Sequence, residues 1–157
     1  MKMTSEVERI IQQMQNAFDG EAWHGPALAE ILGDVDAKMA AARPVASAHT
    51  IWELTLHIMA WEEVIRRRLG GEPVTLPDEQ NFPKIADASE AAWRKTVEGL
   101  KEKHKVLLAA VSVLPLARLE DKVPGKNYNV YTMLHGSAQH VIYHAGQIVM
   151  LKRALDH

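Results

Sequence analysis

The stretch that decides the fold is HGSAQHVIYHAGQ, residues 135–147, with His140 and His144 at its centre. Residues four apart on an α-helix lie on the same face, so the two imidazoles meet side by side. Such a pair can present two nitrogen ligands to one metal ion. Eight histidines among 157 residues make one pair of this spacing unsurprising by chance. A set of core histidines bonded to the backbone or to one another is therefore the alternative.

The pair falls on the inward stripe of a predicted last helix, from about Val130 to Ala154. That stripe carries Met133, Ser137, His140, His144, Gln147 or Ile148, and Leu151. Bundle interiors are where metal sites are commonly built, from side chains of facing helices. The position on the stripe thus favours a metal more than the spacing alone does.

Three further segments have helical spacing of apolar residues, from Thr4 or Ser5 to Gly20, from Thr50 to about Leu69, and from Ser89 to Pro115. Residues 22–32 read either as another helix or as a kinked continuation of the first. A short helical turn is expected at residues 36–42. No strand pattern appears, so the sequence predicts an all-α four-helix bundle.

Residues 70–88 contain three prolines and show no periodicity. A connection of this length either crosses over the structure or covers a functional site as a lid. The linker at residues 116–129 holds the turn signal Pro124-Gly125, with short extended pieces on either side as an open alternative.

The composition argues against several kinds of partner and limits which residues could bind a metal. The balance of 47% hydrophobic and 24% charged residues is that of an ordinary globular protein, expected to form one domain over residues 1–157. The net charge of −2 argues against nucleic acid or an anionic membrane as the partner. No apolar run approaches a membrane span and no signal peptide is evident, so we expect a cytoplasmic protein. Without cysteine, a metal must be held by His, Asp or Glu.

His57, on the border of the buried face of the second long helix, could face His140 and His144. Three neutral imidazoles with open water positions form a catalytic type of site. This ligand set suits Zn, Ni, Fe or Cu and disfavours Mg or Ca. The His-x3-His pair lacks the glutamate of a zinc peptidase, and the di-iron, nucleophile-elbow and phosphate-loop patterns are absent.

Several stretches together resemble the DinB/YfiT family of small helical metalloproteins. They are IWELTLHIMAW at 51–61, PGKNYNVYTMLHG at 124–136 and QHVIYHAGQI at 139–148, with AWHGPAL at 22–28 and ASEAAW at 88–93. The resemblance implies a four-helix bundle of up-down-down-up topology, in which residues 70–88 cross over between the second and third long helices. It also implies a divalent metal, zinc or nickel by expectation, held by His57, His140 and His144.

The better understood branches of this family are thiol-dependent transferases and isomerases that use bacillithiol, mycothiol or glutathione. The resemblance therefore implies a metal-dependent thiol S-transferase, with a low-molecular-weight thiol as cofactor and a small electrophilic molecule as substrate. The alternatives are a metal-dependent hydrolase, or a non-catalytic, stress-associated metal-binding bundle that forms a homodimer through a helix face.

Four more residues are candidates for the pocket or for supporting the ligands. We expect His24 to face solvent. The alternative is that it serves as a fourth ligand, a base or a substrate contact. Trp61, one turn beyond His57, reads as core or as a pocket wall. Gln147 and Glu53 each lie one turn from a ligand and could orient an imidazole, and Glu53 could also act as a general base. His104 reads as a bonded core histidine.

Overall fold

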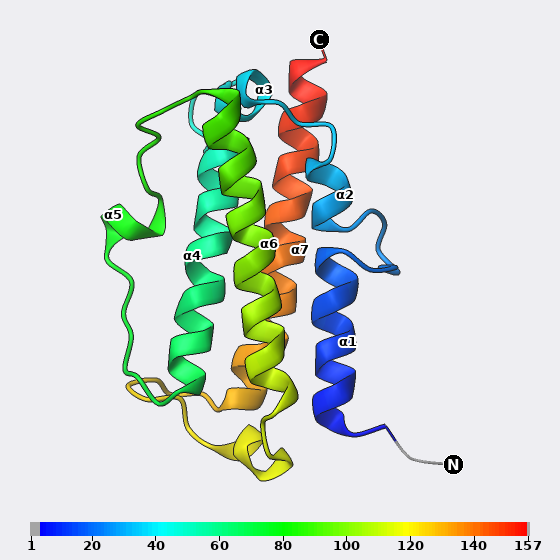
Figure 1. Cartoon of the computed structure of the whole chain (residues 1–157), viewed down its shortest axis with the longest axis vertical. Helices are drawn as coiled ribbons and strands as arrows, with labels where there is room; N and C mark the ends of the chain where they lie inside the picture. Colours follow the sequence, from blue (N-terminus) through cyan, green and yellow to red (C-terminus); the bar gives the residue numbers. More distant parts are fainter. Residues whose placement is uncertain (1–3, 157) are drawn as a thin grey trace.

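The structure, a computed structural model, describes residues 4–156, and this part of the chain is all-helical (Figure 1). Its elements are α1 (Glu6–Phe18), α2 (Leu28–Leu32), α3 (Ala37–Ala41), α4 (Ile51–Leu69), α5 (Asp78–Asn81), α6 (Glu90–Ser112), the 3-10 helix η1 (Leu116–Glu120) and α7 (Val130–Leu155). Strand-like pairing among the described residues is limited to an isolated bridge between Lys122 and Asn129. The predicted all-α class is confirmed. Within residues 4–156, no helix combines the length and apolarity needed to cross a membrane.

Polar caps set the starts of the long helices. The N-cap side chain accepts a hydrogen bond from the backbone N–H three residues later at each of Ser5, Thr50, Ser89 and Asn129. In α1 and α4 a glutamate at that third position bonds back to the cap, which completes a capping box. These short-range bonds are why the predicted helix starts agree closely with the observed ones.

Helix ends differ more from the prediction. α1 ends at Phe18, and α2 begins only at Leu28, so residues 22–32 do not continue the first helix. Pro26 precedes the N-cap of α2 and lies outside the helix. α6 ends at Ser112, and the linker that follows forms η1.

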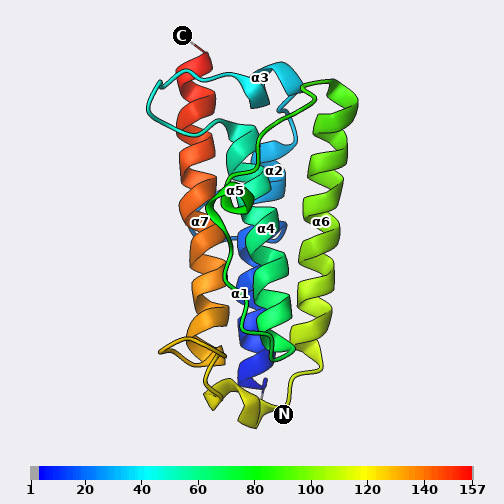
Figure 2. The same ribbon diagram turned by 90° about the vertical axis from the view of Figure 1, so that its left-hand side faces the viewer.

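The four long helices lie side by side (Figures 1 and 2). In Figure 1, α1 and α7 run upward, whereas α4 and α6 run downward. α4 packs against both α6 and α7, and α1 packs against α7 and α6. The facing pair of α4 and α7 is the one that brings the candidate ligands together.

The apolar core consists of two clusters that divide along this pair of helices. One contains Ile58 of α4 and Val141 of α7, and the other contains Ile65 and Ala138 of the same helices. Between Ala138 and Val141 the chain places a histidine instead of an apolar residue. The candidate site therefore lies where the two apolar clusters meet.

The segment at residues 70–89 returns along the outside of α4 to the start of α6 (Figure 2). It contains the short helix α5, where the sequence shows no periodicity. Pro77, with φ of −65°, is the N-cap, and Asp78 and Glu79 occupy the first turn, where carboxylates favour the helix N-terminus. This crossover packs against α4 and reaches the histidines.

Candidate metal centre

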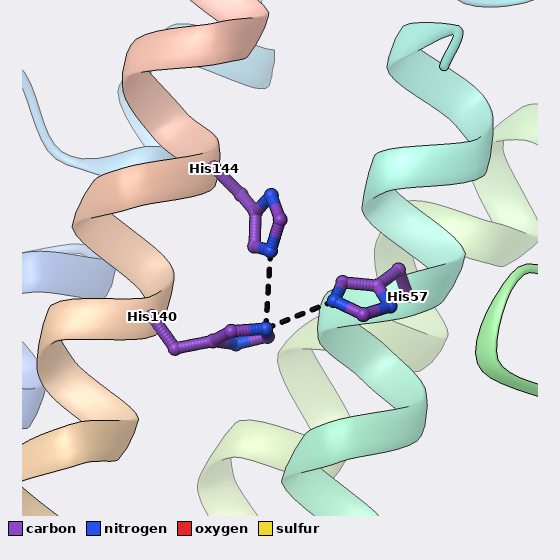
Figure 3. A group of neighbouring side chains, drawn as sticks. All are labelled: His57, His140 and His144. Atoms are coloured by element: carbon purple, nitrogen blue, oxygen red, sulfur yellow. Dashed lines mark hydrogen bonds between the residues drawn. The ribbon is translucent and has the colours of Figure 1, made fainter. Parts of the chain in front are cut away.

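Three imidazoles converge between α4 and α7 (Figure 3). The Nε2 of His140 lies 2.9 Å from the Nε2 of His57 and 3.1 Å from the Nε2 of His144. One potential ligand atom from each residue lies within 4.8 Å of the other two. The helical spacing of His140 and His144 supplies two nitrogens, and the packing of α4 on α7 supplies the third.

The hydrogen bonds at the Nδ1 atoms of His57 and His144 determine which form of each ring faces His140. The Nδ1 of His57 donates to the backbone carbonyl of Asn81 at 2.9 Å, and the Nδ1 of His144 donates to the Oε1 of Gln147 at 2.5 Å. Because carbonyl oxygens only accept, each Nδ1 carries the hydrogen of a neutral ring. Each Nε2 therefore directs a lone pair toward His140.

Two inward lone pairs require an electron-poor partner between them. The Nε2 of His140 lies in that place, so we assign the hydrogen of this ring to it, as the donor to His57 and His144. A metal cation could take that place once the hydrogen of His140 lies on its Nδ1, because all three Nε2 atoms would then have a lone pair to donate. The arrangement thus fits a metal bound by three neutral imidazoles.

Burial keeps these rings neutral. His57 is 6% exposed and His144 is 7% exposed. Burial lowers the pKa of both, and burial together with the neighbouring His144 and His57 lowers the pKa of His140 to about 3. Neutral imidazole is the form that binds metals, so no proton has to leave these rings at neutral pH, and the hydrogen of His140 only has to move from its Nε2 to its Nδ1.

The crossover forms one wall of the site. The ring of Phe82 stacks on His57, with centroids 4.3 Å apart and planes 3° from parallel. His49 stacks on the other face of Phe82 at 3.7 Å. The side chain of Asn81 accepts a hydrogen bond from the indole of Trp61 at 3.0 Å. The crossover therefore has the covering role that a lid would have, and it is held by a hydrogen bond to a candidate ligand.

The structure places two of the four supporting candidates at the site. Gln147 bonds to His144 as described, and Trp61 lies beside the ligands, with its ring centroid 5.9 Å from that of His140. Glu53 instead accepts hydrogen bonds from the backbone of Thr50 and from Arg43, both at 2.8 Å. Its position one turn before His57 thus serves the helix cap, and Asn81 orients the imidazole.

His24 is exposed and lies in a groove with Trp23 and Ile142, and the metal-binding group among residues 4–156 does not include it. His104 is buried at 3% exposure, as expected for a core histidine, and its Nδ1 lies 3.3 Å from the Oε2 of Glu62. Its Nε2 has no hydrogen-bond partner within the described chain, so this histidine is only half satisfied.

Asn81 and Phe82 are the functional residues that sequence reasoning missed. They contact His57 from 24 and 25 residues away through a segment without periodicity. The available signal was the length of the connection at residues 70–88, which is typical of a crossover or of a cover over a site.

The fold and the site together define a class of protein, a helical bundle in which three histidines converge. Residues 22–148, which include all three histidines, match the DinB superfamily. The chain belongs to the DinB superfamily. No curated protein and no solved structure matches the chain.

Proposed function

We propose that this protein binds one divalent transition metal through His57, His140 and His144, with zinc or nickel as the first candidates. The observation that carries the proposal is the convergence of three Nε2 atoms within 4.8 Å, two of them with their lone pairs directed inward. Nitrogen ligands suit these metals and not Mg or Ca.

We further propose that the protein is a metal-dependent transferase that joins a low-molecular-weight thiol to a small electrophile. A divalent metal held here would lower the pKa of a bound thiol and so supply a thiolate at neutral pH. The chain has no cysteine, so the thiol has to come from a separate molecule. Asn81 and Gln147 hold two imidazoles in place, while Phe82 stacks on His57 and Trp61 lies beside His140.

The test is turnover of 1-chloro-2,4-dinitrobenzene by the purified, metal-loaded chain with glutathione, bacillithiol or mycothiol in parallel. We expect at least one thiol to support a rate above its uncatalysed reaction, and that rate to disappear on chelation and in His144→Ala. The uncatalysed rate with all three thiols would contradict the transferase. Metal-dependent loss of ester or amide substrates without any thiol would identify a hydrolase instead.

An up-down-down-up bundle over one domain also belongs to the proposal. The directions of the four long helices in Figure 1 support this order, because the crossover returns the chain to the same end of the bundle before α6 begins. Limited proteolysis that leaves a single core fragment containing α1 and α7 is the expected result.

A further inference from the structure

Arg68 is a buried cation without an acidic partner in the described chain. It is 3% exposed, and it lies three helical turns beyond His57 on nearly the same face of α4. Its Nε and Nη2 donate to the carbonyl of Val74 at 3.1 and 2.8 Å, and its Nη1 donates to the hydroxyl of Tyr128 at 3.1 Å. Its guanidinium carbon lies 5.4 Å from the ring centroid of Trp61. All these partners are neutral.

These contacts leave the positive charge of Arg68 without a negative partner and leave some of its N–H donors without an acceptor. A guanidinium has five N–H donors, and the three bonds to Val74 and Tyr128 use three of them. The carbonyl end of α4, where Arg68 occupies the last turn, offsets part of the positive charge. Buried arginines are normally paired with a carboxylate, because removing a cation from water is costly.

A cavity of about 250 Å³ connects this cation to the metal centre. Arg68 and His140 both line it, and Trp61 lies along the wall between them. Met133 and Gly136 are among its other lining residues, and the walls formed by the described chain contain no carboxylate. The cavity is therefore positive at one end and reaches a candidate ligand at the other, and its walls are mostly apolar with the hydroxyl residues Tyr128, Thr132 and Ser137 among them.

We propose that this cavity binds a short carboxylic acid, with the carboxylate on Arg68 and the apolar body pointing toward His140. This deepens the proposed function, since it names the substrate class of the same site. Guanidinium groups bind carboxylates through paired, charge-assisted N–H donors, and two of the five donors of Arg68 make no hydrogen bond within the described chain. A dianionic phosphate would need a second cation, which the lining residues do not offer. The volume suits a small acid better than a tripeptide thiol such as glutathione.

The experiment is calorimetric titration of butyrate, butyramide, inorganic phosphate and glutathione into the full chain, both metal-loaded and metal-stripped. We expect butyrate to bind both forms, and to bind the metal-stripped form more tightly than the other three probes do. Arg68→Met should raise the dissociation constant of butyrate roughly tenfold or more, because a charge-assisted contact is lost. Circular dichroism and thermal unfolding check that this variant folds.

Two glycines of α7 supply a variant and its matched control that leave Arg68 intact. A Cβ on either Gly136 or Gly146 has no atom within 4 Å, so both accept a side chain. Gly136 lines the cavity, whereas Gly146 lines a separate groove. Gly136→Leu should abolish butyrate binding, and Gly146→Leu should leave it unchanged.

Unchanged affinity in Arg68→Met or in Gly136→Leu would overturn the proposal. Stronger binding of phosphate or glutathione than of butyrate to the metal-stripped chain would overturn it as well. Butyrate binding that disappears on metal removal would place the carboxylate on the metal instead. If the protein binds no metal, the proposed function fails but the carboxylate site does not, because the metal-stripped chain should still bind butyrate through Arg68.

Discussion

The Nδ1 of His57 donates a hydrogen bond to the backbone carbonyl of Asn81 at 2.9 Å, which joins a candidate metal ligand to the crossover 24 residues away. This bond fixes the tautomer of His57 and directs its Nε2 toward His140. The crossover is thereby part of the candidate metal centre, in addition to connecting two helices.

Phe82→Ala should weaken metal binding. The ring of Phe82 covers one face of His57, and its loss admits water and frees the imidazole to rotate. We expect the dissociation constant for zinc to rise roughly tenfold, as for other groups that support a ligand. Competition with a chromophoric chelator measures it. Ile85→Ala, a half-buried apolar residue of the same crossover, is the control and should keep near-native affinity.

Gln147→Leu should weaken metal binding by a similar factor, because the Nδ1–H of His144 loses its acceptor. Gln147→Glu retains an acceptor and should bind zinc at least as tightly as the native chain. Gln139→Leu, an exposed glutamine on the same helix, controls for the change of residue type. Equal affinities of Gln147→Leu and Gln139→Leu would show that Gln147 does not support the ligand.

His104 and Glu62 form a buried pair, 3% and 2% exposed, outside the metal centre. His104→Leu should destabilise the protein by about 2–4 kcal/mol, since it leaves the Glu62 carboxylate buried without its partner. The double variant Glu62→Met with His104→Leu should recover much of that loss. Urea unfolding of the four members of the cycle tests this, and additive effects of the two substitutions would argue against a coupled pair.

The metal-stripped protein should lose stability as the pH falls below 6.5. Burial and the two neighbouring histidines lower the pKa of His140 from 6.5 to about 3, so the unfolded chain binds a proton that the folded chain does not. The stabilising contribution is complete above pH 6.5 and is lost progressively toward pH 3. Between pH 6.5 and 5 the free energy of unfolding should fall by about 1–2 kcal/mol. His140→Gln should make this part of the urea-unfolding profile less steep, while His57 and His144, whose pKa values burial also lowers, keep part of the slope. An unchanged slope would contradict a contribution from His140.

The helices could be predicted because their information is local. Apolar spacing and the caps at Ser5, Thr50, Ser89 and Asn129 act within one helical turn, and the resemblance to a known family pointed to the same fold. The ends of α1 and α6 were less predictable, since a helix can stop several residues before a glycine or proline without a local signal.

The site was predictable only in part. The helical spacing places His140 and His144 on one inward face, and it places His57 at the border of the buried face of its own helix. The contacts of Asn81 and Phe82 depend on how an aperiodic crossover folds back onto α4, which no spacing encodes. Arg68, in the last turn of α4, looks like a solvated charge next to Arg66 and Arg67, and only the packed structure shows that it is buried.

The most direct measurement is calorimetric titration of zinc into the chelator-stripped chain and into single alanine variants. We predict about one zinc per native chain, complete loss of tight binding in His57→Ala, His140→Ala and His144→Ala, and native binding in His24→Ala. Native stoichiometry and affinity in all three ligand variants would contradict a metal centre built from these histidines.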